Sequence, residues 1–524
     1  MDTIKKKLKR LRAGNPPRFM DLFAGCGGIT LGFVTAGFEL VASVDSDPWA
    51  AESHGANFAH ISYGSRQQGH FKARDIMIET PSSIFRDLGI DGAADDQVDV
   101  LVGGPPCQAF ARVGRAKLRH EAHRRDEDDA DVAFLVDGRV NLWRRYLHYV
   151  RKTKPLALLM ENVPDILNHG GKNVADTVSE HLRKEGYRVR YTLLNASWFG
   201  VPQIRERMFL VGVHRDLDED VLFPAPTHHT PLPPGYEGTR ATARKLISEA
   251  IGLPFASEQS HRWIDDPSEG SALPATTAEQ ALADLPPIHA LELLEAGKLS
   301  RGRKDPSEPV TYLSVKPTTK WSRLMREWPG FGASGHTTGH VIRYLPRDYK
   351  IFRMMEEGWE YPQIWRFVEA KREQLMNGRW RAGVNGFSNS QDAKEFARQW
   401  TLPYDPGKFP NKWWKLYRDR PVRTLMAHLG KDSYSHIHFD SEQARTISVR
   451  EAARLQSFPD GFSLKGSMNP ALKQIGNAVP PLVAYAIAMA MRTMLGCRHL
   501  PDIRSDVLGV DRRLLHTTTG KEDK

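Results

Sequence analysis

A single cysteine stands directly behind a stiff turn at the end of an apolar run. In DVLVGGPPCQAF, residues 99–110, Cys107 follows two glycines and two prolines. Prolines restrict the backbone around them and so fix where the sulfur points. A thiolate held in this way can attack an electrophilic carbon if a helix N-terminus or an arginine activates it. A lone cysteine is more often an inert buried side chain, so its neighbours must decide between the two.

Two further motifs carry charges that such a reaction needs. The apolar run PLALLMENV leads into Glu161, and a carboxylate at this position is costly to bury without a partner, which favours a functional role. In QIRERMFLVGV, Arg205 and Arg207 alternate with other residues, so in a strand both would point to one face. The arginines are either a pair of cations aimed at a site or part of a solvated sheet edge.

A third group of residues predicts a cofactor. DLFAGCGGITLGF places a glycine turn at residues 23–27, where a ligand can approach the backbone and meet a helix N-terminus. Its spacing differs from the dinucleotide fingerprint, and a purely structural turn is the alternative. Asp45 ends VASVDSD roughly 20 residues later, where an acidic side chain grips ribose hydroxyls. Asp75 and Ile76 offer a carboxylate and an amide for a base edge, although Asp45 or Asp75 taken singly also fits a helix cap or a turn.

All of these residues follow apolar runs, so one sheet edge must position them. From residue 18 to about 213, short apolar runs alternate with longer amphipathic stretches. The predicted strands are RFMDLFAG, ELVASVDSD, VDVLVGGPP, PLALLMENV and RMFLVGV. This rhythm predicts an α/β fold with a doubly wound, mostly parallel sheet.

The rhythm breaks between about 214 and 420 and returns afterwards. The middle segment has proline-rich loops, a helix that we expect Thr276 and Glu279 to cap, and, between Trp321 and Trp414, eight of the 12 tryptophans, which we interpret first as core residues. TISVREAARLQSF and PPLVAYAIAMAMRTM then need a sheet to pack against. We predict a basic arm at 1–17, an α/β domain in two parts at 18–213 and 421–499, an irregular insert at 214–420, and a loose polar tail at 500–524.

Composition limits the class of protein. The net charge of +10 and the pI near 9.3 favour a polyanionic partner. Three cysteines cannot form a disulfide framework or a four-thiolate zinc site. No apolar run approaches the roughly 18 residues of a membrane span, so we predict a cytoplasmic protein with no membrane association.

Two groups of residues could suggest a metal, but we predict none. His120, His123 and Asp126 lie in a charged stretch that is better interpreted as a mobile loop. His436 and His438 in SHIHFD are better interpreted as strand residues than as ligands.

Six motifs in this order carry a resemblance to a known family: DLFAGCGG, GGPPCQ, ENV, QIRER, TISVREAARLQSFPD and KQIGNAVPP. They resemble the DNA (cytosine-5)-methyltransferases of the bacterial Dcm type, over residues 18–213 and 421–492. The resemblance implies a class I S-adenosylmethionine-dependent methyltransferase fold, in which 214–420 is the target recognition domain. It also implies double-stranded DNA as substrate, with the target cytosine flipped out of the duplex.

The resemblance further implies a role for each site residue. Cys107 would add to carbon 6 of the cytosine, and Glu161 would bind ring nitrogen 3 and the exocyclic amine. Arg207, and secondarily Arg205, would hold the cytosine carbonyl, while carbon 5 receives the methyl group of S-adenosylmethionine. The implied cofactor-binding residues are Phe23, Gly25, Gly27, Asp45, Asp75, Ile76, Pro106, Leu142 and Asn477. Because Asn477 comes so late in the sequence, the resemblance also implies that the last helix packs beside the first strand.

The sequence differs from the family pattern in two places, and two other functions are alternatives to DNA methylation. Ala111 replaces the usual serine, and the loop at 115–136, which we expect to close over the flipped base, is longer than in the family. A cytosine-5 RNA methyltransferase is one alternative, which the long segment 214–420 disfavours. An inactive DNA-binding homologue is another, which the intact Cys107, Glu161 and Arg207 disfavour. A restriction or phage-defence nuclease is the further partner that the resemblance suggests.

Overall fold

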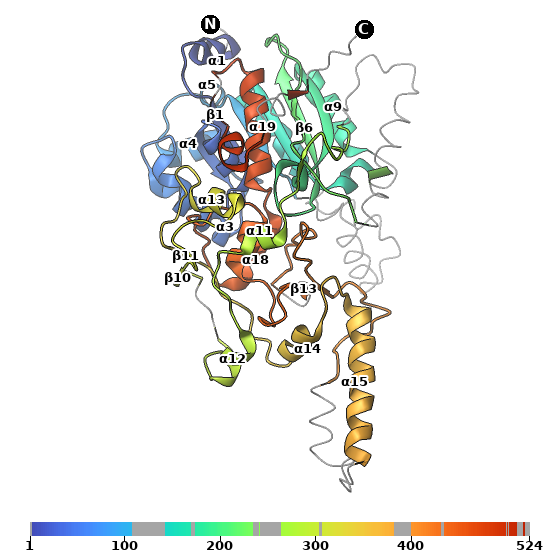
Figure 1. Cartoon of the computed structure of the whole chain (residues 1–524). Helices are drawn as coiled ribbons and strands as arrows, with labels where there is room; N and C mark the ends of the chain where they lie inside the picture. The colour runs from blue at the N-terminus through green and yellow to red at the C-terminus, as the bar shows by residue number, and fades with distance from the viewer. Residues whose placement is uncertain are drawn as a thin grey trace, which may run out of the picture.

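A six-stranded sheet forms the upper part of the described structure (Figure 1). The computed structural model describes residues 3–106, 142–168, 173–233, 240–241, 264–302, 306–381, 400–430, 434–498, 500, 502–510 and 517–518. The strands are β1 (Arg18–Leu22), β2 (Glu39–Val44), β3 (Val100–Gly103), β4 (Ala157–Asn162), β5 (Tyr187–Asn195) and β6 (Glu206–His214). Their order is β2-β1-β3-β4-β6-β5, and β6 runs antiparallel to both of its neighbours while the other pairings are parallel. The predicted mostly parallel α/β sheet is confirmed.

Strand β5 is the strand that the apolar runs did not predict. Tyr187, Val189 and Tyr191 are buried in it, but Arg188 and Arg190 alternate with them. This period of two indicates a strand with one face toward the core, and a search for continuous apolar runs misses such a pattern.

Both faces of the sheet are covered, as a doubly wound fold requires. On β4, Ala157 and Leu159 pack into one core, whereas Leu158 and Met160 pack into the other. The first core also holds side chains of α2 (Gly28–Thr35) and α19 (Pro481–Met494). The second holds side chains of α4 (Pro81–Leu88), α8 (Leu142–Thr153) and α9 (Val174–Lys184). Burial on both faces explains why these strands are nearly continuous apolar runs.

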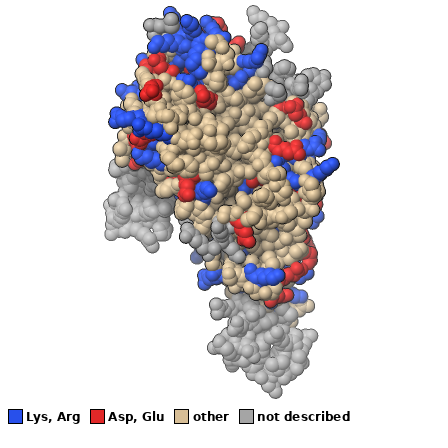
Figure 2. Space-filling model, turned by 90° about the vertical axis from the view of Figure 1, so that its left-hand side faces the viewer, with Lys and Arg blue, Asp and Glu red and all other residues tan. Residues whose placement is uncertain are grey.

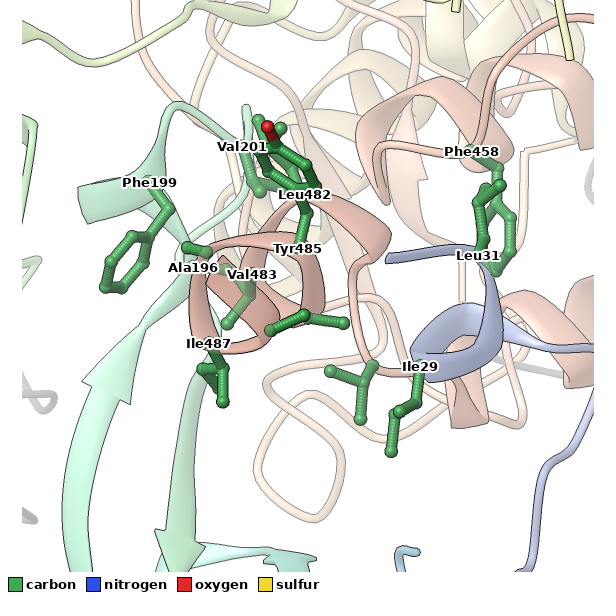
Figure 3. Close-up of a cluster of buried hydrophobic side chains, with 14 of the residues drawn as sticks. Ile29, Leu31, Ala196, Phe199, Val201, Phe458, Leu482, Val483, Tyr485 and Ile487 are labelled. Carbon is green, nitrogen blue, oxygen red and sulfur yellow. The ribbon is translucent and has the colours of Figure 1, made fainter. Parts of the chain in front are cut away.

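Helix α19 brings the end of the chain back to the start of the sheet. Figure 3 shows Leu482, Val483 and Ile487 of this helix among side chains from the segment 196–201, with Ile29 of α2 nearby. A Cβ on Gly32 of α2 would lie 2.5 Å from the backbone nitrogen of Tyr485, so glycine permits this close approach. The helix that we expected beside the first strand therefore packs on α2, the helix that follows that strand.

The segment after β6 builds small elements, some of which join the first core of the sheet while others surround a separate core. Its strands are β7 (Phe223–Pro224), β8 (His228–His229), β9 (Leu273–Pro274), β10 (Pro309–Thr311), β11 (His336–Thr338), β12 (Trp413–Lys415) and, past residue 420, β13 (Tyr434–Ile437). Its helices are α11 (Ala278–Leu282), α12 (Ala290–Glu295), α13 (Lys320–Arg326), α14 (Tyr349–Met354) and α15 (Tyr361–Arg381). Helix α15 projects from the lower end of the molecule (Figure 1). The tryptophans at positions 321, 328, 413 and 414 are at most 5% exposed, which confirms their interpretation as core residues.

Two local expectations are wrong. Helix α11 is capped by Thr277 and Gln280, one residue later than predicted, because Thr276 Oγ1 donates instead to the Gly200 carbonyl (2.8 Å). The tail is packed where it is described: a helical turn at Arg504–Leu508 has a buried Leu508, and β14 (Thr517–Thr518) pairs with β7.

The basic N-terminal arm contains a docked helix, α1 (Thr3–Arg12). Ile4 and Leu11 are buried, and the buried Lys7 ammonium donates to three backbone carbonyls. Lysine and arginine gather at the end of the molecule that carries α1 (Figure 2).

One stretch of the described chain is apolar enough to be considered as a membrane span. Met468–Met494 has a mean hydropathy of 1.2, but 89% of its most apolar window is buried inside the protein. It consists of α18 (Met468–Asn477) and α19, which are separate helices of the core.

Candidate active site

A glutamate and an arginine meet at the carboxyl edge of the sheet. Glu161 is near the end of β4, and Arg207 is the second residue of the antiparallel neighbour β6. Arg207 Nε lies 3.2 Å from Glu161 Oε1, and the side chains are 15% and 14% exposed. The antiparallel pairing produces this meeting, because it places the start of β6 beside the end of β4.

The turn that leads to Cys107 lies against the same carboxylate. A Cβ on Gly104 would be 2.9 Å from Glu161 Oε2, so only glycine leaves room for this carboxylate without a shift. Asn162 Nδ2 donates to the Pro105 carbonyl (3.2 Å) and holds the turn in place. Pro106 is exposed. Cys107, the loop 115–136, Ala111, His120, His123 and Asp126 lie outside the described residues.

Burial and the neighbouring arginines act on the Glu161 carboxyl in opposite directions. Burial raises the pKa of the Glu161 carboxyl, and the guanidinium groups of Arg207 and Arg205 oppose this rise. A carboxyl with a raised pKa can hold a proton and donate it in a hydrogen bond, which a fully ionised carboxylate cannot. The site can therefore present both a donor and a fixed cation to a bound ring.

Arg205 and Arg207 make different contacts. The Arg205 guanidinium is buried and donates to the carbonyl oxygens of Leu425 (2.9 Å) and Gly476 (3.0 Å). Arg205 directly precedes the first strand residue, Glu206, and the charges of both arginines act on the Glu161 carboxyl. Arg205 also ties the last part of the chain to the edge that carries Glu161.

The glycine turn forms an open cradle at the end of β1. Phe23, Gly25 and Gly27 all have positive φ angles, of 58°, 56° and 104°. The Gly25 N–H donates to Asp45 Oδ2 (2.8 Å), and the other carboxylate oxygen of Asp45 accepts from Asp47 N–H (2.8 Å). Space beside Gly25 is open within 4 Å of a Cβ, and no side chain caps the N-terminus of α2.

The other predicted cofactor residues are connected to this cradle by a backbone hydrogen bond, by a shared core or by the chain next to α2. The Arg74 N–H donates to the Asp45 carbonyl (2.7 Å) and so connects Asp45 to the exposed Asp75. Ile76 is buried in the same core that Phe23 and Leu142 contact. Asn477 is exposed at the end of α18, and the chain just after it lies against the start of α2, where a Cβ on Gly28 would be 2.2 Å from Val479 O.

A polar network behind the cradle was missed by the sequence reasoning. Thr30 Oγ1 of α2 donates to Asp21 Oδ2 of β1 (2.6 Å) and lies 3.0 Å from His54 Nε2, and Ser43 Oγ lies 3.2 Å from His54 Nδ1. Burial raises the pKa of Asp21 to about 7 and lowers the pKa of His54 to about 3. The signal was present, since Asp21 is a charged residue inside an otherwise apolar strand.

Trp49 was also missed. It is 38% exposed at the start of α3 (Pro48–Phe58), four residues after Asp45. An exposed tryptophan beside a predicted ribose site offers a flat apolar surface for a base.

His436 and His438 are both buried. His436 lies in β13 and His438 directly follows it; burial lowers their pKa values to about 4 and about 3. In the described ranges, no group of three histidine, cysteine, aspartate or glutamate side chains is arranged to hold a metal ion.

Comparisons with known proteins cover most of the chain. Residues 17–493 match the family described as C-5 cytosine-specific DNA methylase. The protein M.OihORF3336P of Oceanobacillus iheyensis is 34% identical over 484 residues, which cover 92% of this chain and 97% of that protein. The type II methyltransferase M.AgeI of Thalassovita gelatinovora is 30% identical over 505 residues, covering 91% of this chain and 99% of that protein. A crystal structure of a prophage-encoded Escherichia coli protein has the same fold, with a TM-score of 0.54 and 19% identity over 92% of this chain and 99% of that chain.

Proposed function

The chain belongs to the C-5 cytosine-specific DNA methylase family, and from this premise we propose how its own residues perform the reaction. The protein is a DNA (cytosine-5)-methyltransferase, which transfers a methyl group from S-adenosylmethionine to carbon 5 of cytosine in DNA. A base inside the duplex is out of reach, so the target cytosine must be flipped into the site at the sheet edge.

Cys107 is the nucleophile in this proposal. Its thiolate adds to carbon 6 of the flipped cytosine, which makes carbon 5 electron-rich enough to attack. Carbon 5 takes up the methyl group, and loss of the carbon 5 proton then expels the Cys107 sulfur and restores the ring. Support comes from the sequence position of Cys107, directly after the turn that packs against Glu161.

Glu161 and Arg207 hold the ring during this addition, and their ion pair is the observation that carries the proposal. Glu161 binds ring nitrogen 3 and the exocyclic amine, and its raised pKa favours donation to the nitrogen as negative charge develops in the ring. Arg207 binds the cytosine carbonyl. We assign Arg205 a positioning role, because its guanidinium is committed to the backbone carbonyls of Leu425 and Gly476.

The cradle at the end of β1 fits the cofactor. When bound, S-adenosylmethionine supplies an electrophilic methyl group on a sulfonium centre. Phe23, Gly25 and Gly27 would contact its methionine and ribose side, where the open space beside Gly25 leaves room for a ligand. Asp45 would bind the ribose hydroxyls, and the remaining pocket residues would be Asp75, Ile76, Pro106, Leu142, Asn477 and, with its exposed ring, Trp49.

The biological setting follows from the relatives. Because M.AgeI is a type II methyltransferase, we infer that this enzyme works in the cytoplasm beside a cognate restriction or defence nuclease. We assign residues 214–420 as the target recognition domain, inserted between the two parts of the catalytic domain at 18–213 and 421–499. Lysine and arginine contacts to phosphates should make its DNA binding fall with salt.

The experiment that tests this proposal traps the covalent step. Duplex DNA with 5-fluorocytosine at the target position, incubated with S-adenosylmethionine, should yield a covalent complex through residue 107, because fluorine cannot leave as a proton does. Cys107→Ala should abolish both the complex and methyl transfer while DNA binding persists, and Cys497→Ala, a half-buried cysteine far along the chain, serves as the matched control. A labelled peptide without residue 107, or methyl transfer to transfer RNA rather than to duplex DNA, would contradict the assignment.

A further inference from the structure

An arginine on α8 clamps the turn that carries Asp75 and Ile76. Arg145 Nε and Nη2 both donate to the Ile76 carbonyl (3.0 and 2.8 Å), and Nη2 also donates to the Glu79 carbonyl (3.2 Å). From one helical turn further along α8, Tyr149 Oη donates to the same Glu79 oxygen (2.9 Å). A guanidinium therefore links the beginning and the end of the segment 75–79.

The clamped segment is itself a tight turn that directly follows a backbone bond to Asp45. The N–H groups of Ile78 and Glu79 donate to the Asp75 carbonyl, and the Met77 N–H donates to the Asp75 side chain. The backbone of residue 74 is bonded to Asp45, so the turn is tied to the predicted ribose acid at one end and to α8 at the other. Ile76 is buried while Asp75 is exposed, which leaves the carboxylate accessible to a ligand.

We propose that Arg145 is a positioning residue that sets the adenine side of the S-adenosylmethionine pocket by fixing the backbone of the turn 75–79. This inference rests on the proposed function, because it takes Asp75 and Ile76 as cofactor contacts. In this proposal Arg145 makes no contact with the cofactor. It acts through the Ile76 carbonyl, whose position determines where the Ile76 amide and the Asp75 carboxylate lie.

The chemistry of arginine explains why this residue type is needed. A guanidinium has five N–H donors in a rigid plane, so it can serve two carbonyls at once in a fixed geometry. Lysine can reach one of them as a flexible point charge, and glutamine presents a single amide group. Loss of Arg145 would leave the Glu79 carbonyl bonded to Tyr149, but it would remove both bonds to Ile76.

The neighbouring Arg144 provides a matched control. It is exposed on the same helix, and its guanidinium lies over the Trp143 ring, 5.4 Å from the ring centre, rather than on the turn. Replacing Arg144 changes net charge and helix composition in the same way as replacing Arg145. The two variants therefore differ in the contact to the turn.

The test compares R145Q, R145K, Y149F, R144Q and D75A in the full chain. Calorimetric titration gives the dissociation constant for S-adenosylmethionine and for its demethylated product, steady-state kinetics give KM and kcat, and thermal melting reports folding. We expect R145Q to raise the dissociation constant and the cofactor KM about 10-fold, as the loss of charged hydrogen bonds predicts, with kcat reduced less than about twofold. R145K should lie between R145Q and wild type, Y149F should weaken binding by about threefold, and R144Q should match wild type.

The outcomes separate the inference from the function on which it rests. If D75A weakens cofactor binding and R145Q does not, the inference is wrong and the proposed pocket stands. If neither variant changes binding, the pocket assignment is wrong and the inference falls with it. Equal weakening in R144Q, or a fall in kcat with unchanged affinity in R145Q, contradicts a positioning role. If R145Q does not fold, R145K decides, because it keeps the charge without the paired contact to Ile76, and wild-type affinity in a folded R145K overturns the inference.

Discussion

The sheet and the junction between the insert and the last part of the chain bury polar groups in different ways. In strand β1 the buried carboxyl of Asp21 has an uncharged partner, Thr30, from the helix that follows the strand. At the junction, Arg454 of α17 (Val449–Leu455) contacts both Asp284 and Asp460, and all three side chains are fully buried. The network also holds Tyr312 and Arg326, which both belong to the insert.

This difference teaches how each region is held together. The sheet is stabilised by apolar contacts along neighbouring strands, which many residue types can supply. The junction depends on charges whose desolvation is repaid only when every partner is present and correctly placed. We infer that the junction fixes the orientation of the insert relative to the sheet edge more strictly than apolar packing would.

Removing one partner from the junction should have the largest effect. Asp284→Ala leaves the buried guanidinium groups of Arg454 and Arg326 short of a carboxylate, so we expect the free energy of unfolding to fall by about 3–5 kcal/mol. Denaturant unfolding followed by fluorescence measures this loss.

The matched control is an exposed ion pair. Arg353 and Glu442 are 52% and 62% exposed and lie 2.6 Å apart, so Glu442→Ala should cost no more than about 1 kcal/mol. Equal costs for Asp284→Ala and Glu442→Ala would mean that the two regions do not differ in the way described.

The buried carboxyl in the sheet should produce a smaller effect that depends on pH. The pKa of Asp21 is raised from 3.8 to about 7, mainly by burial and to a lesser extent by the nearby Asp45, while its bond from Thr30 lowers it. The folded state therefore holds the proton more tightly than the unfolded state, so the stabilising contribution of this carboxyl is complete below pH 4 and is lost as pH rises through about 7. Between pH 5 and pH 8 this carboxyl should cost about 2–3 kcal/mol, and Asp21→Asn should remove that loss.

The control for this prediction is an aspartate whose pKa is shifted the other way. Hydrogen bonds from Val221 and Arg190 lower the pKa of Asp220, so its stabilising contribution is complete above its unfolded pKa and is lost only in acid. Asp220→Asn should therefore follow the wild-type stability curve in parallel from pH 5 to pH 8. A parallel curve for Asp21→Asn as well would show that Asp21 ionises freely in the folded protein.

The same contrast explains what could be predicted from the sequence. Strands β1, β2, β3, β4 and β6 were predicted because burial on both faces leaves a local apolar run. Glu161 was placed at the sheet edge for the same reason, since it comes near the end of such a run. The local pattern also identified the glycine turn, whose positive φ angles glycine accommodates.

The contacts that depend on distant residues could not be predicted. Arg454 and Asp284 are 170 positions apart, and Arg205 reaches carbonyls 220 and 271 positions away. The hydrophobic periodicity around one residue does not indicate which distant residue its side chain will contact. In the insert, sequence reasoning recovered the burial of tryptophans but not the elements that bury them.

The smallest predicted effect tests a local signal inside the insert. Thr277 caps α11, where its side chain accepts from the Gln280 N–H (3.2 Å) and the Gln280 side chain accepts from the Thr277 N–H (3.0 Å). Thr277→Ala should therefore lower the free energy of unfolding by about 1 kcal/mol, whereas Thr277→Ser should retain the cap and most of the stability. Both variants are compared with wild type by denaturant unfolding.

Because α11 leads directly to Asp284, a loss of 3 kcal/mol or more in Thr277→Ala would show that this cap supports the buried junction. A loss near 1 kcal/mol would instead mean that the junction holds Asp284 in place without it.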